Sequence, residues 1–235
     1  MSTNNQNKSS PKKHSRFNLI NLLILACVAV SLLFWMSGES EVGYFAFSTQ
    51  NLMEGRWWTL ITALFIHADI LHLAGNMLFL YAFGNSLENE VGTAKTFLAF
   101  FLGGILSFLL GVFFYAPSDL LIGASAAIFT LTAVVLLVKP LKFSFIFLMP
   151  LGLVAIIYMI YNVVAVQTGV EGNIAYISHV IGFAIGIPLG LAWSKNLLKN
   201  LLITLGLFLL YLFITIFLLP YILQLLGIQS IQSLV

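Results

Sequence analysis

The chain of 235 residues carries very little charge: 8% of its residues are Asp, Glu, Lys or Arg, whereas 60% are hydrophobic. An ordinary globular domain carries about a quarter charged residues. A soluble protein of this length could not bury so much apolar surface, so lipid must cover part of it. The low charge therefore excludes a pair of soluble domains and indicates one membrane domain in contact with a lipid bilayer.

Cysteine is almost absent as well, since Cys27 is the single thiol of the sequence. One thiol excludes an internal disulfide and a cysteine-based metal cluster. We expect the protein to need no cofactor and no metal.

Seven apolar stretches, each close to the roughly 20 residues that cross about 30 Å of hydrocarbon, predict seven transmembrane helices. Their approximate limits are 17–36, 66–87, 96–116, 120–138, 143–166, 174–193 and 201–224. The first is longer than the apolar core of a signal peptide and has no small-residue cleavage site after it, so we expect a retained helix. The predicted fold class is all-α, a polytopic transmembrane helical bundle.

The chain divides into three parts by composition. Residues 1–16 are polar and basic with no apolar run, and we expect them to form a disordered cytoplasmic tail. Residues 17–194 are predicted to form a six-helix membrane core. Residues 195–235 add a C-terminal transmembrane helix and a short tail, and this helix is expected to lie outside the core because it carries few polar groups.

The basic residues predict the orientation, because cytoplasmic loops carry an excess of Lys and Arg. With a cytoplasmic N-terminus, nine of the ten basic residues lie inside: Lys8, Lys12, Lys13, Arg16, Lys95, Lys139, Lys142, Lys195 and Lys199. Only Arg56 lies outside. A basic tail is also compatible with nucleic-acid binding, but the orientation already accounts for it, and no nucleic-acid partner is expected.

Four polar residues lie inside the apolar stretches, where polar groups are expensive and usually face a bundle interior or a cavity. His72 and Asn76 lie one turn apart in the second stretch and share a face, while Ser125 and His179 lie in the fourth and sixth. Counted from the inner end of each stretch at about 1.5 Å per residue, all four reach a similar depth in the outer part of the membrane. Three helices of common direction thus bring them into one layer.

A stripe of small residues, Gly182, Gly186 and Gly190, allows another helix to approach the sixth helix closely. Contact between the fourth and sixth helices would bring the Ser125 hydroxyl within reach of the His179 imidazole. A neutral imidazole can take the proton of a serine hydroxyl and make it a nucleophile. We therefore predict that Ser125 is a catalytic nucleophile and His179 its general base.

A serine nucleophile also needs hydrogen-bond donors for the oxyanion that forms during acyl transfer. The Asn76 amide, a protonated nitrogen of His72 and the backbone N–H of Ser125 are the candidates. Asp69 lies about two turns above Asn76, too high to complete a triad, so a Ser–His dyad is predicted. Asp69 is expected to cap the second helix, and His67 to anchor a loop or lie at the interface.

These residues resemble the sequence elements of the rhomboid family of intramembrane serine proteases, over roughly residues 54–193. The elements are His72-Leu-Ala-Gly-Asn76 (HxxxN), Gly84-x-x-x-Glu88-x-x-x-Gly92 (the connection after helix two), Gly123-Ala-Ser125-Ala (GxSG) and Ser178-His179-Val-Ile-Gly182 (AHxxG). The sequence departs from the family at Ala126, where glycine is commonest, at Ser178, where alanine is usual, and at Thr59, near a common arginine. Phe129 stands where some members have a tyrosine that packs under the histidine ring.

The resemblance implies a nucleophile at Ser125, a general base at His179, and oxyanion stabilisation by His72 and Asn76. It also implies that residues 37–65 form a partly membrane-embedded loop holding Trp57 and Trp58. The fifth helix and the loop after it would be a mobile gate for a substrate helix. An added seventh helix occurs in part of the family.

Three functions compete for this sequence. The first is a serine endopeptidase that cuts transmembrane protein substrates, in a cell membrane, with its active site opening toward the extracytoplasmic side. The second is a non-catalytic rhomboid-like protein that binds membrane clients, although such proteins typically lack the serine or the histidine. The third is a proton or metal transporter using His67, Asp69, His72 and His179, although the inner halves of the fourth and sixth stretches are apolar.

Overall fold

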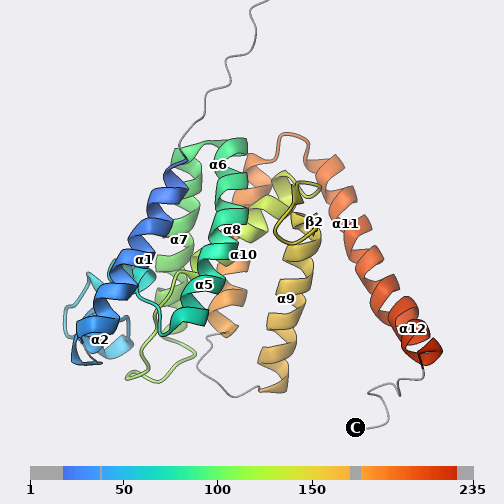
Figure 1. Ribbon diagram of the computed structural model, residues 1–235. Coiled ribbons are helices and arrows are strands. Elements are labelled where there is room, and N and C mark those ends of the chain that lie inside the picture. The colour runs from blue at the N-terminus through green and yellow to red at the C-terminus, as the bar shows by residue number, and fades with distance from the viewer. Residues whose placement is uncertain (1–17, 38, 170–175, 227–235) are drawn as a thin grey trace, which may run out of the picture.

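The computed structural model describes residues 18–37, 39–169 and 176–226, and within these ranges the chain is a bundle of helices (Figure 1). In this part of the chain, five helices are long and apolar enough to cross a membrane. They are α1 (Leu19–Ser37), α7 (Thr93–Gly111), α9 (Leu151–Thr168), α10 (Tyr176–Trp193) and the continuous helix Leu197–Leu225. This last helix consists of α11 (Leu197–Phe213), the π-helical turn η3 (Ile214–Leu218) and α12 (Leu219–Leu225). The chain is therefore a multi-pass membrane protein, and the predicted all-α bundle is confirmed.

A bent pair of helices and one short helix complete the bundle. The pair joins Thr59–Phe65, which is α4 (Thr59–Thr62) and the 3₁₀ turn η1 (Ala63–Phe65), to Ile70–Val91 at an angle of 95°. The second arm contains α5 (Ile70–Phe79), the π-helical turn η2 (Leu80–Gly84) and α6 (Asn85–Val91). The short helix is α8 (Ser125–Val138). The predicted tail at residues 1–16 lies outside the described residues.

Several helix limits differ from the prediction, and the starts of three helices show the structural reasons. The second helix begins at Ile70 rather than 66, because the Asp69 side chain caps it by accepting hydrogen bonds from the Leu71 and His72 N–H groups. The fourth begins at Ser125 rather than 120, because Leu121 pairs with the backbone of Phe47. The fifth begins at Leu151 rather than 143, because a hairpin of β1 (Phe143–Ser144) and β2 (Met149–Pro150) precedes it.

The link between α1 and α4 is folded around one arginine. It contains α2 (Glu39–Phe45) and α3 (Thr49–Met53), which lie beside one end of α1 in Figure 1. Arg56 donates to the Asn51 side chain at 2.9 Å, pairs with Glu54 at 2.8 Å, and stacks over the Tyr44 ring. Asn51 in turn donates to the carbonyls of Gly43 and Ala46. Arg56 thus anchors the link, three residues before Thr59.

The centre of the bundle is α8, in which every residue after Ser125 is buried. Its most extensive contacts are with α10 and α7. A Cβ at Gly182 would overlap the Ala126 carbonyl oxygen, and one at Gly186 would overlap the Thr130 carbonyl oxygen. Thr130 Oγ1 donates across this contact to the Gly182 carbonyl at 2.7 Å. The predicted close approach of the fourth and sixth helices at the glycine stripe is confirmed.

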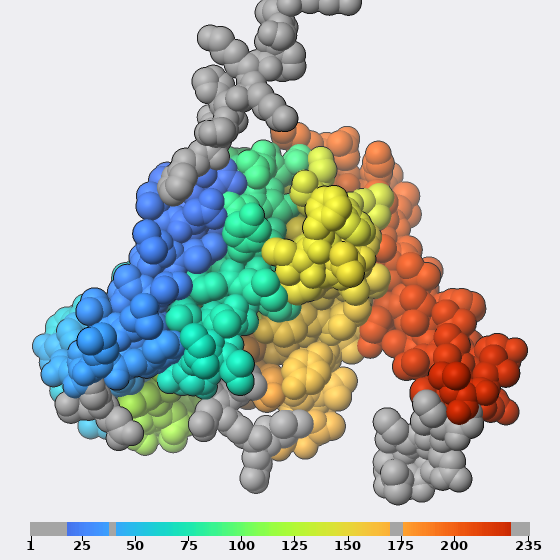
Figure 2. All heavy atoms as spheres, in the orientation of Figure 1, coloured from blue at the N-terminus to red at the C-terminus, as the bar shows by residue number. Residues whose placement is uncertain are grey.

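The C-terminal helix packs on the core along about its first half. Asn200 and Thr204 donate to the Val138 and Leu136 carbonyls, and Leu207 is the buried residue of α11. Figures 1 and 2 show α12 diverging from α9 toward the other end of the bundle. Apart from Leu207, the described residues of this helix are half-buried or exposed.

Replacing Gly182 with alanine should lower the free energy of unfolding by about 1–3 kcal/mol, the usual penalty of overpacking, because the added Cβ meets backbone rather than a flexible side chain. Gly206→Ala is the matched control, since a Cβ at this position of α11 meets nothing within 4 Å. Thermal melting in detergent micelles measures both. Equal melting temperatures for the two variants would contradict the packing described for α8 and α10.

Candidate active site

Ser125 is the first residue of α8, and the loop before it needs glycine. Gly123 has φ +108°, a left-handed conformation that side chains rarely adopt. A Cβ at Gly123 would also lie 2.8 Å from His72 Nε2. The Gly123 N–H donates to the Ala63 carbonyl at 2.8 Å, which ties the loop to the bent helix pair. Ser125 is therefore presented at the start of a buried helix, with the second helix pressed against the preceding loop.

His179 meets this serine from α10. Its Nε2 lies 2.7 Å from Ser125 Oγ, and the residue is 6% exposed. The imidazole stacks on the Phe129 ring with centroids 4.7 Å apart, and Phe129 stacks in turn on Tyr158 of α9 at 4.4 Å. The phenylalanine at this position thus packs under the histidine ring as the resemblance implied. The structure brings together the two residues predicted from the sequence as nucleophile and base.

A third residue completes the contact, and the sequence analysis missed it. Asn162 of α9 is 1% exposed, and its Oδ1 lies 2.7 Å from His179 Nδ1. An amide oxygen accepts a hydrogen bond as a carboxylate oxygen does, so the lack of a carboxylate at this depth does not exclude a third member. A lone asparagine inside an apolar stretch was the signal that could have found it, because polar groups inside a membrane are expensive.

Hydrogen-bond partners assign the protons in this chain of groups. Asn162 Nδ2 lies 2.7 Å from the Tyr158 carbonyl, which can only accept, so the amide NH₂ faces that carbonyl and Oδ1 faces the imidazole. Because Oδ1 also only accepts, His179 Nδ1 carries the proton. His179 Nε2 then has a free lone pair, which accepts the Ser125 hydroxyl proton.

His72 and Asn76 lie beside the loop that precedes the serine. A Cβ at Gly123 would be 2.8 Å from His72 Nε2 and 3.6 Å from Asn76 Nδ2. The Ala68 N–H donates to His72 Nδ1 at 3.4 Å, a long bond that leaves the proton of the ring on Nε2. Asn76 Nδ2 is buried and has no hydrogen-bond partner among the described residues, and such a donor is costly to leave unpaired. Two potential donors thus lie beside Gly123, two residues before Ser125.

A second serine–histidine pair provides a contrast. Ser31 is fully buried, and its Oγ lies 3.0 Å from His67 Nδ1 and 3.1 Å from the Phe65 carbonyl. His67 Nε2 accepts from the Ala124 N–H at 3.4 Å, so His67 Nδ1 carries the proton and donates it to Ser31. The Ser31 hydroxyl then donates to Phe65. This histidine cannot take a proton from its serine, and its role is to anchor the loop before Ser125, as expected from the sequence.

Comparison with known proteins finds one family model and several relatives, all of them rhomboids. Residues 54–196, which include all of these polar residues except Ser31, match the family model of the Rhomboid domain. The chain is 36% identical over 83 residues to Rhomboid-like protein 11, chloroplastic, of Arabidopsis thaliana, covering 35% of this chain and 30% of that protein. It is 32% identical over 115 residues to Putative rhomboid protease YdcA of Bacillus subtilis, covering 48% and 54%. It is 35% identical over 92 residues to Rhomboid protease GluP of the same species, covering 39% and 18%. The chain spans about half or less of the length of these relatives.

The hydrogen bonds of the two serine–histidine pairs run in opposite directions, and this predicts a difference in the reactivity of the two serines. An alkyl fluorophosphonate, which phosphonylates an activated serine with loss of fluoride, should label Ser125 and leave Ser31 unmodified. Mass spectrometry of the labelled protein identifies the site. Ser125→Ala should abolish labelling, whereas Ser31→Ala, the matched control, should retain it. Labelling that survives Ser125→Ala, or a label found on Ser31, would contradict the proton assignment.

Proposed function

The chain belongs to the rhomboid family, and from this premise we propose that it is an intramembrane serine protease. It hydrolyses peptide bonds in or near the transmembrane helices of other membrane proteins. The observation that carries the proposal is the 2.7 Å contact between Ser125 Oγ and a His179 Nε2 that holds a free lone pair. A serine placed against such a nitrogen can lose its proton as it attacks.

The reaction follows from these two residues. Ser125 Oγ attacks the carbonyl carbon of the substrate peptide bond while its proton passes to His179 Nε2. The tetrahedral intermediate collapses, the C–N bond breaks, and His179 Nε2 gives its proton to the departing amine. A water molecule then attacks the acyl-enzyme, again with His179 as base, and releases the second product and the free Ser125 hydroxyl.

Asn76 and His72 are the proposed oxyanion donors. Asn76 Nδ2 is buried without a partner among the described residues, and His72 Nε2–H lies beside Gly123. The backbone N–H of Ser125 is a third potential donor. It belongs to the first residue of α8, where the helix dipole also favours negative charge. Donors already in place where charge develops stabilise the transition state more than the ground state, which accounts for the unpaired amide in the resting protein.

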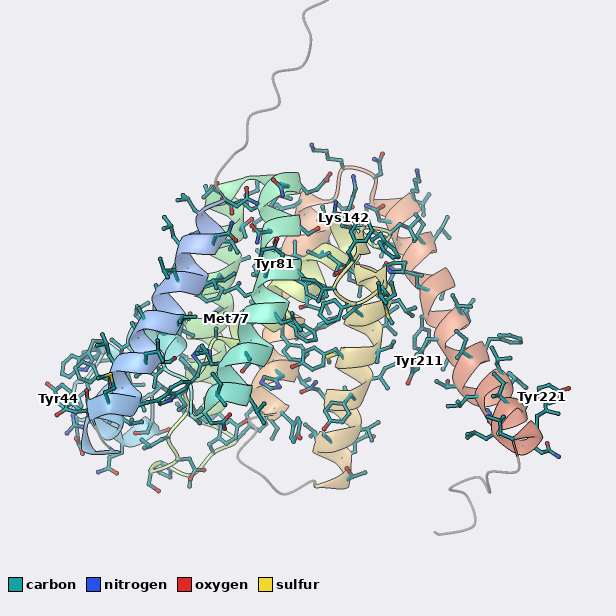
Figure 3. The ribbon with its side chains drawn as sticks, viewed as in Figure 1. Tyr44, Met77, Tyr81, Lys142, Tyr211 and Tyr221 are labelled. Carbon is teal, nitrogen blue, oxygen red and sulfur yellow. The ribbon has the colours of Figure 1, made fainter. Side chains whose placement is uncertain are left out.

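The proposed site opens toward the extracytoplasmic side of a cell membrane, with the N-terminus in the cytoplasm. Four lysines, Lys95, Lys139, Lys195 and Lys199, line a cavity of about 310 Å³ at the end of α8 opposite Ser125. Lys142 lies at the same end (Figure 3). Basic residues favour the cytoplasmic side. At about 1.5 Å per residue α8 rises about 21 Å, so Ser125 lies roughly 9 Å inside a hydrocarbon layer of about 30 Å.

The two alternative functions have less support. A client-binding protein without catalysis has no need of the Ser125–His179 contact. In a metal transporter the histidines would have to be free, whereas His179 and His67 each use both ring nitrogens in hydrogen bonds. Within the described ranges, no group of three or more His, Cys, Asp or Glu side chains is arranged to hold a metal ion.

Purified protein should cleave a reporter membrane protein whose single transmembrane helix carries small residues near its outer end. Ser125→Ala and His179→Ala should each reduce the rate to background, because the nucleophile and its base act as one unit. Gly206→Ala, whose added methyl group meets nothing within 4 Å, should cleave at the rate of the unchanged protein. Cleavage retained by either of the first two variants, with melting temperatures unchanged, would overturn the proposed dyad.

A further inference from the structure

We propose that Asn162 is a positioning residue of the protease, which holds His179 in the tautomer and orientation needed to take the proton of Ser125. The inference rests on the proposed function and extends the predicted Ser–His pair to Ser125–His179–Asn162. It assigns to α9 a part in the reaction in addition to any part in substrate access. Asn162 touches neither substrate nor the reacting atoms and acts through the imidazole alone.

The first argument is the direction of the hydrogen bonds. A neutral imidazole can carry its proton on Nδ1 or on Nε2, and only the first form leaves Nε2 free to act as the base for Ser125. Asn162 Oδ1, 2.7 Å from Nδ1, stabilises that form because an amide oxygen can only accept. The Asn162 amide cannot turn around, because its Nδ2 is held at 2.7 Å by the Tyr158 carbonyl.

The second argument concerns rotation of the ring. The stack on Phe129 fixes the plane of the imidazole, with an angle of 12° between the two rings. A stack alone permits a half-turn of the ring about its Cβ–Cγ bond, which preserves the plane of the ring and exchanges Nδ1 with Cδ2 and Nε2 with Cε1. The hydrogen bond to Asn162 favours one of these two orientations, because a ring carbon placed opposite Oδ1 could not donate this bond. Phe129 and Asn162 together therefore leave the imidazole one arrangement.

The third argument separates this role from ordinary helix packing. Asparagine often stabilises contacts between membrane helices by binding backbone carbonyls. Asn162 satisfies its NH₂ within its own helix, at Tyr158, and its oxygen contacts the catalytic imidazole on another helix. Asn89 makes only the bond within its own helix. Its Nδ2 donates to the Asn85 carbonyl one turn earlier, and the residue is exposed.

Three variants test the role. Asn162→Leu keeps the approximate size and removes the acceptor, Asn162→Asp keeps an acceptor for Nδ1–H, and Asn89→Leu is the matched control. Reporter cleavage gives kcat and KM, and thermal melting reports folding. We expect Asn162→Leu to lower kcat by about tenfold or more, as loss of the orienting group does in other serine proteases, with KM and melting temperature little changed. Asn162→Asp should recover most of kcat, and Asn89→Leu should match the unchanged protein.

The outcomes separate this inference from the function on which it rests. A kcat unchanged in Asn162→Leu would overturn the positioning role while leaving the protease intact. A lower kcat accompanied by a lower melting temperature, and not recovered by Asn162→Asp, would assign Asn162 to packing and also overturn the role. Absence of cleavage by the unchanged protein, or cleavage that persists in Ser125→Ala, would overturn the proposed function and the inference with it.

Discussion

The close approach of α8 and α10 is the constraint on which the rest of the site depends. At Gly182 the two backbones are so near that a methyl group would overlap the Ala126 carbonyl oxygen. Ser125 lies one residue before Ala126, and His179 lies three residues before Gly182. The short serine side chain can therefore reach the imidazole directly, at 2.7 Å. A helix separation set by larger side chains, at the usual 8–10 Å, would leave the two groups apart.

The described residues contain two serine–histidine contacts, and the hydrogen-bond partners give them opposite directions. Ser125 and Ser31 each lie within hydrogen-bond distance of a histidine. Their chemistry differs because of the group on the far side of each ring. Asn162 accepts from one imidazole and makes its other nitrogen a base, whereas the Ala124 N–H donates to the other imidazole and makes its second nitrogen a donor. The neighbours of a histidine thus decide which way a proton can move.

Much of the fold and the central pair could be predicted from the sequence, because membrane spanning and helix contact leave local signals. Apolar runs indicated the helices, and Gly182, Gly186 and Gly190 indicated the contact that joins Ser125 to His179. The helix limits were less predictable, since the start of α8 depends on Leu121 pairing with distant Phe47. The pairing of His67 with Ser31 also depends on tertiary contact, because the two residues lie 36 positions apart.

Asn162 illustrates the same limit at the site itself. Its helix runs in the opposite direction to those of Ser125 and His179. Depths estimated for helices of one direction therefore do not include Asn162. The sequence shows only an isolated amide among apolar residues, and its partner is decided by the packing of α9 on α10. The stack of Phe129 on Tyr158 shows the same dependence, since the two residues lie on different helices and far apart in the sequence.

The position of the His179 imidazole depends on where α9 lies. Tyr158 and Asn162 lie one turn apart on this helix, and the catalytic imidazole is held by the amide of one and, through Phe129, by the ring of the other. If α9 swung aside to admit a membrane helix, the Asn162 side chain would leave His179 and the Tyr158 ring would leave Phe129 in the same movement, while Phe129 itself stays on α8. In the proposed protease, cleavage would then require α9 to return, and a helix that wedges α9 outward without letting it return would act as an inhibitor. Selectivity would come from which helices permit re-closure as well as from which can bind.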